Sequence, residues 1–523
     1  MSYRVFIPTA GLGSRLKGLS RYVNKALVTL ADKPVISHII EKFSPDIEIV
    51  VALGYKADSV REFLTLAYPE RTFLFRQVSI YEGEGSGLGL TLLECQDLLQ
   101  CPFIFCSNDT LVTDDIPAPE SNWMGFYNAP DNSQYRSLRI YSGKVEEICA
   151  KGAEGDVKTY IGLAGIHDFN QFWQAMSDGR TTGAIEIGES YGLRQLLSQG
   201  VLPIEFDWHD TGNVAALESA RKKIKAKVEA NVLEKEQEAI WFVNNKVIKF
   251  SIDHKFIRDR VLRAQTLQGF VPKITASTDN MYVYDLIDGE VLSKHPTADK
   301  FANLLGWLEG FWLPCDLDAS QQAEFNQQCL AFYRDKTFER VKQYFLRFEQ
   351  IDQAEVINDQ PMPTVQAMLE KVDWESLSQG SASRFHGDLH FENILMTYSD
   401  DKSFSLIDWR QNFAGNMVFG DIYYDFAKLN HGLIMCHELV DKDLFDIRQN
   451  GKLVHMDFLR KHSLVKCEKL FETWLINNGY DYKKVKLLTA LIFLNIAALH
   501  HYPYSLLLFY LGKQMLHEHL NDD

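Results

Sequence analysis

The sequence lacks any Cys-x-x-Cys pair, although it contains eight cysteines. Structural zinc sites usually take their thiolates from such closely spaced pairs, so we expect no zinc site. Cysteines scattered along a chain are typical of reduced thiols in the cytoplasm, where we expect this protein to reside. Positive charge is also scarce: 54 Lys and Arg residues stand against 70 Asp and Glu, a net charge of -16. A protein that wraps DNA or RNA needs a basic surface, so we expect no nucleic-acid partner.

The chain also lacks a hydrophobic run long enough to span a bilayer. Its most apolar stretch, residues 487–499, contains Asn495 and is followed by His500, so we expect a core helix there and no membrane insertion. Residues 1–8 run directly into a predicted strand, and we therefore expect no signal peptide. Small-molecule substrates are the expected partners, and the sequence leaves an oligomer open.

The chain length and its apolar pattern predict more than one domain. A chain of 523 residues is too long for one ordinary core. Up to about residue 240, short apolar runs alternate with helical patterns, and the runs at residues 5–7, 47–53 and 103–106 are predicted to be buried strands. This alternation indicates an α/β domain with a mostly parallel sheet. Ligands bind beyond the carboxyl ends of such strands, where Gly11 and Asp109 fall.

A predicted helix over residues 214–230 ends this first domain. After it, two apolar runs flank Asn244 and Asn245, which tolerate the positive φ of a tight hairpin turn. From about residue 300 the sequence is mostly helical. We therefore predict one domain at residues 1–230 and a second at residues 231–523, divided into a smaller lobe at 231–299 and a helical lobe at 300–523.

The first candidate site begins with Gly11-Leu12-Gly13, directly after a predicted strand. Glycines let the backbone approach phosphate oxygens and present amide donors to them. Arg15 adds a planar cation that can bind phosphate through two hydrogen bonds. The glycine motif alone would fit an ordinary strand-to-helix turn equally well, so its surroundings decide the interpretation.

About the first 225 residues resemble the nucleotidyltransferases that make nucleotide sugars and CDP-alcohols. That family opens with Gly-x-Gly-x-Arg and has a lysine shortly before a Lys-Pro pair, as Lys25 stands before Lys33-Pro34 here. The proline that commonly precedes this lysine is Asn24 in our chain. The resemblance implies a Rossmann-like mixed sheet and an attack of the acceptor phosphate on the α-phosphorus of a nucleoside triphosphate, with release of pyrophosphate.

The same resemblance implies four groups of site residues. The triphosphate would be held by Gly11, Gly13, Arg15 and Lys25. The base would lie beside Gly85 and Gly87. The acceptor would lie near Lys151, Gly162 and Glu186. Mg²⁺ would be bound by Asp109 and Asp210, with Asp207 as the alternative to Asp210.

The second candidate site is the segment His386-Gly387-Asp388, followed by Asn393 and Asp408. Protein kinases use an Asp to accept the hydroxyl proton, and an Asn and a later Asp to hold magnesium. From about residue 233 to the end, the chain resembles the aminoglycoside phosphotransferase and choline kinase families, which implies a bilobal, protein-kinase-like α+β domain.

By this second resemblance Asp388 is the catalytic base, and Asn393 and Asp408 are the magnesium ligands. Lys249, on the strand after the predicted hairpin, would hold the ATP phosphates, with Asp259 where the family usually has a Glu. Arg410 follows Asp408 closely and disfavours a quaternary ammonium such as choline near the site.

Together the two sites predict a bifunctional enzyme with ATP and a second nucleoside triphosphate as substrates and Mg²⁺ at both sites. One half would phosphorylate a small alcohol or sugar, and the other would couple the product to a nucleotide. CTP is slightly preferred, because the first domain lacks the C-terminal extension of many sugar-specific relatives, and UTP is the alternative. The product would be an activated donor for capsule or lipopolysaccharide synthesis. A nucleotide-sensing module, or a chain with only one active half, is the alternative reading.

Overall fold

The computed structural model describes residues 3–226, 228, 237–398 and 403–521. The chain forms two compact units, each described separately below. Unit 1 comprises Met1–Ile257 and Thr275–Leu286, and unit 2 comprises Arg258–Ile274 and Ile287–Asp523. Among the described residues, no helix is both long enough and apolar enough to cross a membrane.

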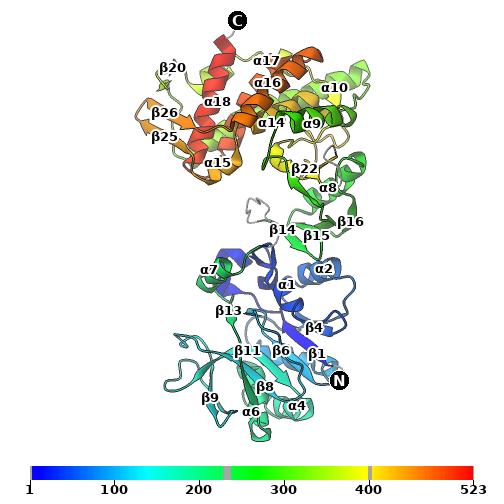
Figure 1. Cartoon of the computed structure of the whole chain (residues 1–523), viewed down its shortest axis with the longest axis vertical. Coiled ribbons are helices and arrows are strands. Elements are labelled where there is room, and N and C mark those ends of the chain that lie inside the picture. Colours follow the sequence, from blue (N-terminus) through cyan, green and yellow to red (C-terminus); the bar gives the residue numbers. More distant parts are fainter. Residues whose placement is uncertain (1–2, 227, 229–236, 399–402, 522–523) are drawn as a thin grey trace. The chain divides into compact units, whose positions relative to one another are not determined.

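Unit 1 is built on a nine-stranded mixed sheet with β1 near its centre (Figure 1). β1 (Arg4–Pro8) pairs in parallel with β4 (Glu48–Leu53) on one side and with β6 (Phe103–Cys106) on the other. β4 also pairs in parallel with β5 (Phe73–Gln77). Beyond β6 the pairing turns antiparallel at β11 (Lys158–Ile166). The three strands predicted from apolar runs are confirmed, and so is the predicted mixed α/β class of the first half.

The rest of the sheet follows β11. The remaining strands are β8 (Trp123–Tyr127), β9 (Ser137–Tyr141), β10 (Lys144–Cys149) and β12 (Leu202–Glu205). The helices of this region are α1 (Val35–Ile40), α2 (Ala57–Ala67), α3 (Leu88–Glu94), α4 (Phe169–Asp178), α5 (Ala184–Ile187), α6 (Glu189–Leu196) and α7 (Val214–Lys223). Both faces of the sheet are covered by apolar clusters, which makes its carboxyl edge the place where polar side chains gather.

The last of these helices is shorter than predicted. α7 ends at Lys223, because Ile224 is already extended, at φ −90° and ψ 114°. Further on, the backbone N–H of Val228 donates to Asp32 Oδ2 at 3.0 Å, which ties the chain to a distant loop. Residues 229–230, the end of the predicted helix, lie outside the described residues, as does the predicted domain boundary.

A second sheet of unit 1 begins with the predicted hairpin, which is confirmed. β14 (Glu238–Val243) and β15 (Lys246–Ser251) are joined by Asn244 and Asn245, at φ 52° and 57°. β17 (Met281–Asp285) and β16 (Ile274–Ser277) complete the sheet in the order β14-β15-β17-β16.

This second sheet packs on the core of the nine-stranded domain. The Trp241 ring lies 5.1 Å from the Phe63 ring, nearly perpendicular to it, and Trp241 Nε1 donates to Thr29 Oγ1 at 2.9 Å. The N–H of Phe242 donates to the carbonyl of Asp32 at 2.8 Å. Strands assigned from sequence to the small lobe of the second domain thus share one apolar core with the first domain. The boundary after residue 230 stays a prediction.

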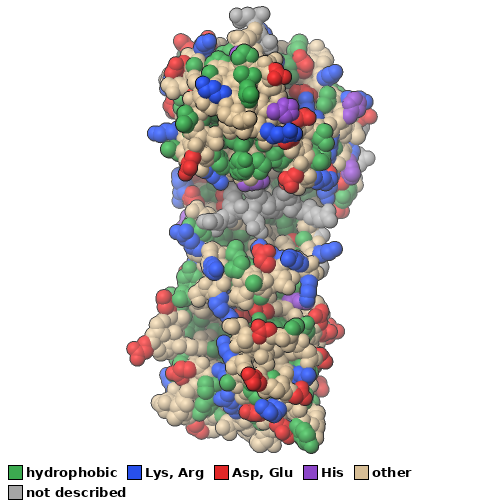
Figure 2. All heavy atoms as spheres, turned by 90° about the vertical axis from the view of Figure 1, so that its left-hand side faces the viewer, with side chains coloured by type: hydrophobic (Ala, Val, Ile, Leu, Met, Phe, Trp, Pro, Cys, Tyr) green, Lys and Arg blue, Asp and Glu red, His purple; other side chains and the backbone are tan. Residues whose placement is uncertain are grey.

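Unit 2 is mainly helical. Its longer helices are α9 (Ala298–Phe311), α10 (Ala319–Leu330), α11 (Lys336–Arg347), α14 (Ile422–Ile434), α16 (His462–Asn477), α17 (Tyr482–Ala497) and α18 (Tyr504–Asn521). α17 packs against both α14 and α18 and is buried along most of its length, which confirms the core helix predicted from residues 487–499. On the face shown in Figure 2, acidic and basic side chains are interspersed.

Short strands in unit 2 position the second candidate site. β22 (Ile394–Thr397) pairs with β18 (Gly289–Val291) on one side and with β23 (Phe404–Leu406) on the other. A single 3₁₀ turn, η6 (Phe391–Asn393), leads into β22. Helix α8 (His254–Thr266) begins in unit 1, and its residues from Arg258 onward belong to unit 2.

Candidate active sites

The loop after β1 is held close to the turn that carries Lys25. Gly13 has φ 68°, and a Cβ at that position would lie 2.8 Å from Lys25 Cβ, so both the conformation and the close approach favour glycine. Asn24 anchors this turn: its side-chain Nδ2 donates to the carbonyls of Thr9 at 3.0 Å and Tyr55 at 2.5 Å. Asparagine in place of the family's usual proline thus anchors the Lys25 turn with side-chain hydrogen bonds.

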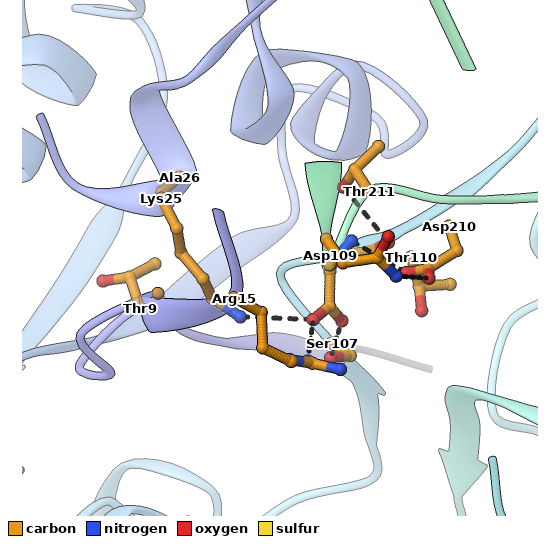
Figure 3. Close-up of polar contacts among 12 residues, drawn as sticks. Thr9, Arg15, Lys25, Ala26, Ser107, Asp109, Thr110, Asp210 and Thr211 are labelled. Atoms are coloured by element: carbon orange, nitrogen blue, oxygen red, sulfur yellow. Dashed lines mark hydrogen bonds and ion pairs between the residues drawn. The ribbon is translucent and has the colours of Figure 1, made fainter. Parts of the chain in front are cut away.

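Asp109 lies after β6, where two cations converge on it (Figure 3). Its Oδ2 lies 3.3 Å from Lys25 Nζ and 3.4 Å from Arg15 Nη2, while Ser107 Oγ donates to Oδ1 at 2.6 Å. Burial by itself would raise the pKa of Asp109, but Lys25, the Ser107 hydrogen bond and Arg15 together hold it below the ordinary value. The carboxylate is therefore ionised near neutral pH.

Asp210 reaches the same place from a different strand. It ends β13 (Trp208–Asp210), which pairs with β7 (Thr110–Val112) just after Asp109. Tyr135 Oη donates to Asp210 Oδ2 at 2.7 Å, and the N–H of Gly212 donates to Oδ1 at 2.8 Å. Burial, with a smaller contribution from Asp109, raises the pKa of Asp210.

Gly212 lies between the two carboxylates. A Cβ there would lie 3.0 Å from Asp109 Oδ2, 3.0 Å from Asp210 Oδ1 and 3.2 Å from Arg15 Nη2. Two carboxylate oxygens that face one small space fit Mg²⁺, which takes oxygen ligands and is usually held by one or two carboxylates together with substrate phosphates. By contrast Asp207, the alternative ligand, is 58% exposed and accepts a hydrogen bond from Thr113 at 2.9 Å.

The glycines expected beside the base also have a packing role. A Cβ on Gly87 would lie 2.4 Å from the carbonyl oxygen of Ile185, so glycine lets the start of α3 approach α5. Gly85 has φ 80° and open space around it. Gly162, at φ 72°, would place a Cβ 2.9 Å from Ser107 Cβ, so it makes room for the hydroxyl that supports Asp109.

The expected acceptor residues Lys151 and Glu186 are exposed. Neither side chain forms a hydrogen bond or an ion pair with any residue that the structure describes, so their roles stay predictions. Sequence reasoning missed Ser107 and Tyr135. Ser107 stands two residues before Asp109 at a strand end, which was an available signal, whereas Tyr135 is 75 residues from Asp210 and gave none.

Asp425, on α14, holds the loop that contains His386 and Gly387 in place. Its two carboxylate oxygens accept hydrogen bonds from the backbone N–H groups of His386 and Gly387, both at 2.7 Å. Trp312 Nε1 also donates to it, at 3.2 Å. Burial raises the pKa of Asp425 to about 6. Burial also lowers the pKa of His386, to about 3. His386 is thus neutral near pH 7, and the assignment of Asp388 as the catalytic base stays a prediction.

Asp388 is surrounded by groups that stabilise its ionised form. Lys428 Nζ lies 2.7 Å from Oδ1, and His390 Nε2 lies 3.8 Å from Oδ2. Burial would raise the pKa of Asp388, but Lys428 and then His390 outweigh it and hold that pKa well below the ordinary value. His390 also contacts Glu392 at 2.9 Å, and its own pKa is raised to about 9: burial lowers it, and the two carboxylates more than compensate.

A backbone hydrogen bond brings the segment that contains Asp408 next to Asn393. The N–H of Ile407, next to Asp408, donates to the carbonyl of Asn393 at 2.9 Å, and Asn393 Nδ2 donates to the carbonyl of Asp388 at 2.9 Å. Asp408 has φ 63°, a left-handed conformation that is uncommon for non-glycine residues and that Asp tolerates better than most. The amide and carboxylate oxygens of Asn393 and Asp408 are ligands that fit Mg²⁺.

Two basic residues, Arg260 and Lys249, remain to be placed relative to the motif residues. Arg260, which the sequence did not indicate, forms an ion pair with Asp408. Lys249 lies buried on β15 in unit 1, on the strand where it was predicted. Asp259, its expected partner, is buried on α8 in unit 2. The assignment of Lys249 to ATP phosphates stays a prediction.

Each half of the chain is similar to known proteins. Residues 257–442 match the phosphotransferase enzyme family, APH, and this segment contains Asp388, Asn393 and Asp408. The N-terminal half is similar to the bifunctional protein GlmU of Methanococcus maripaludis, with 21% identity over 248 residues. That alignment covers 46% of this chain and 59% of the relative, so the chain spans little more than half of the relative's length.

Two solved structures also resemble the N-terminal half. A putative glucose-1-phosphate thymidylyltransferase from Bacillus anthracis is 20% identical, with a TM-score of 0.37, and the match covers 45% of this chain and 98% of that one. The CTP:phosphocholine cytidylyltransferase LicC of Streptococcus pneumoniae is 17% identical, with a TM-score of 0.35 and coverage of 43% and 100%. The two resemblances expected from the sequence are confirmed at the level of domain type. The N-terminal half therefore resembles GlmU, and residues 257–442 match the phosphotransferase family.

Proposed function

We propose that this chain is a bifunctional enzyme that phosphorylates a small alcohol or sugar and then couples the product to a nucleotide. One observation carries the proposal: each site holds a carboxylate kept ionised by neighbouring cations. Asp109 is stabilised by Lys25 and Arg15, and Asp388 is stabilised by Lys428. A nucleotide-sensing module has no need for an ionised carboxylate such as Asp388 beside the oxygens of Asn393 and Asp408.

In the kinase step, the acceptor hydroxyl oxygen forms a bond to the γ-phosphorus of ATP. The bond from that phosphorus to the β–γ bridging oxygen breaks, and ADP leaves. Asp388 accepts the hydroxyl proton, and Lys428 orients its carboxylate at 2.7 Å. Asn393 and Asp408 would hold Mg²⁺, which supplies charge neutralisation on the phosphates when bound.

In the nucleotidyl step, an oxygen of the new phosphate attacks the α-phosphorus of the second nucleoside triphosphate. The bond to the α–β bridging oxygen breaks, and pyrophosphate leaves. Both reactants are anions, so Lys25 and Arg15 reduce their repulsion and stabilise the charge that develops on the triphosphate. Asp109 and Asp210 would hold Mg²⁺, which would neutralise part of the negative charge on the phosphates. We propose CTP as the preferred nucleotide and UTP as the alternative, with a surface-polysaccharide donor as the product.

Two variants of the full chain test whether both halves work. Asp388→Asn removes the base, and we expect the transfer from ATP to fall by about 10²- to 10⁴-fold while pyrophosphate release from a supplied phosphorylated acceptor persists. Asp109→Asn should lower pyrophosphate release from the supplied phosphorylated acceptor and leave the transfer from ATP unchanged. Asp115→Asn is the matched control, because it removes an exposed carboxylate from the segment that follows Asp109 and should change neither rate.

Product identification completes the test. The wild-type chain is incubated with a small-molecule cell extract, ATP and mixed nucleoside triphosphates, and new phosphorylated and nucleotide-linked products are sought by mass spectrometry. Loss of the same product with both Asp variants would support the coupled reaction. If the wild type turns over none of CTP, UTP, dTTP or GTP with any acceptor, the sensing module becomes the better account.

A further inference from the structure

A pair of basic side chains lies on one aromatic ring in unit 2. Lys336, the first residue of α11, has its Nζ 4.2 Å from the centre of the Phe332 ring and 5.6 Å from that of Tyr424. The guanidinium carbon of Arg410 lies 5.0 Å from the same Phe332 ring. Cations prefer this position over an aromatic face, so the ring fixes where both charges lie.

This pair flanks the catalytic loop. Tyr424 lies on α14 one turn before Lys428, whose Nζ contacts Asp388. Arg410 lies beside Gly387, because a Cβ built on that glycine would be 2.6 Å from Arg410 Cβ. Gly387 immediately precedes Asp388. Two independent contacts thus bring Lys336 and Arg410 to the neighbourhood of the proposed base, from different elements.

The local charges do not balance. Asp388 is matched by Lys428 in a close ion pair. Within the part of the chain that the structure describes, Lys336 and Arg410 form an ion pair with no carboxylate, and Arg410 donates through Nε to the backbone carbonyl of Asn412 at 3.1 Å. Both side chains are only partly exposed. Partly desolvated cations are costly to hold together unless an anion joins them.

The electrostatics of Lys336 point the same way. Burial is the largest cause that holds the pKa of Lys336 well below its ordinary value, and Arg410, Lys428 and Arg340 each lower it further. Asp388 acts in the opposite direction and is outweighed. A ligand that brings negative charge to Lys336 would therefore relieve a repulsion already built into the folded protein.

We propose that the acceptor of the kinase site is an alcohol that also carries an anionic group, a carboxylate or a phosphate. Lys336 and Arg410 bind the anionic group while the hydroxyl lies against Asp388. This inference rests on the proposed kinase activity and specifies its substrate class. It also excludes quaternary ammonium alcohols, whose charge would meet two cations where it needs aromatic faces and carboxylates.

The test uses acceptors that share a carbon skeleton and differ in charge. The full-length chain with ATP and Mg²⁺ is assayed on glycerol, D-glycerate and glycerol 3-phosphate, and on ribitol, ribonate and ribitol 5-phosphate. We expect the anionic members of each set to be phosphorylated preferentially. Preference for the acids identifies a carboxylate as the recognised group, and preference for the phosphate esters identifies a phosphate.

Lys336→Met and Arg410→Met should each lower kcat/KM for the anionic acceptor by about 10- to 100-fold, the effect of losing one charge-assisted contact. The KM for ATP should stay unchanged. Lys342→Met is the matched control, because it removes an exposed lysine from the same helix and should have no effect. Arg410 packs against the catalytic loop, so Lys336→Met is the decisive variant if Arg410→Met fails to fold.

Calorimetric titration of the same acceptors separates this inference from the kinase proposal. Transfer to neutral acceptors at equal or greater kcat/KM would overturn the anionic site and leave the kinase in place. So would anionic transfer that Lys336→Met leaves unchanged. Binding of the anionic compounds that is lost in Lys336→Met, without transfer from ATP, would uphold the anion site and overturn the kinase. Absence of both binding and transfer for every anionic compound would overturn the inference.

Discussion

Gly212 offers a direct test of the first site, because it leaves the space between the two carboxylates open. Gly212→Ala would place a methyl carbon 3.0 Å from both Asp109 Oδ2 and Asp210 Oδ1. Ordinary van der Waals contact between carbon and oxygen begins a few tenths of an ångström further out, so the carboxylates must move apart. Displacing catalytic groups by as little as about 1 Å can cost about 10²-fold in rate. The shift needed here is smaller than about 1 Å, but the methyl also fills the space in which the two carboxylates would hold Mg²⁺. We therefore expect nucleotidyl transfer to fall by about 10- to 100-fold.

The fold should tolerate this change better than the activity does. An added methyl in a packed place typically costs about 1–3 kcal/mol, and here its neighbours are the ends of side chains that can rotate. Pyrophosphate release at saturating Mg²⁺ measures the activity, and urea unfolding measures stability. Gly18→Ala is the control, because a Cβ there meets nothing within 4 Å. Nucleotidyl transfer within about twofold of the wild type in a folded Gly212→Ala would refute the two-carboxylate site.

Three further perturbations test separate parts of the structure. Tyr135→Phe removes a hydrogen bond that lowers the pKa of Asp210, so that pKa should rise and the acid limb of the nucleotidyl pH–rate profile should move to higher pH; an unmoved limb contradicts the assignment. Lys428→Met removes the main cause of the low pKa of Asp388, so that pKa should rise. Because the kinase step needs the ionised carboxylate, the acid limb of its pH–rate profile should then move to higher pH. Lys442→Met, which removes an exposed lysine, is its control. Trp241→Ala should lower the free energy of unfolding of unit 1 by about 3–5 kcal/mol in urea denaturation, because the side chain is fully buried in that core; a change confined to unit 2 would contradict the packing of β14.

The local features of the fold followed from the sequence because short-range chemistry determines them. Apolar runs predicted β1, β4 and β6, and the Asn244-Asn245 pair predicted the hairpin turn, as the structure confirms. The predicted helix from residue 214 continued too far, since nothing local marks its end. The chain leaves the helix after Lys223, and the hydrogen bond from Val228 to Asp32 connects residues far apart in sequence.

The sequence by itself determined which chemistry-bearing residues stand at strand ends and loops, because motif spacing and strand periodicity are properties of neighbouring residues. Only the tertiary structure decided what surrounds them. Tyr135 reaches Asp210 across 75 residues, and Lys428 reaches Asp388 from a helix that the motif does not include. It also decided that Lys336 and Arg410 share one aromatic ring beside the base. Such contacts depend on how whole elements pack, and packing joins residues that no local pattern relates.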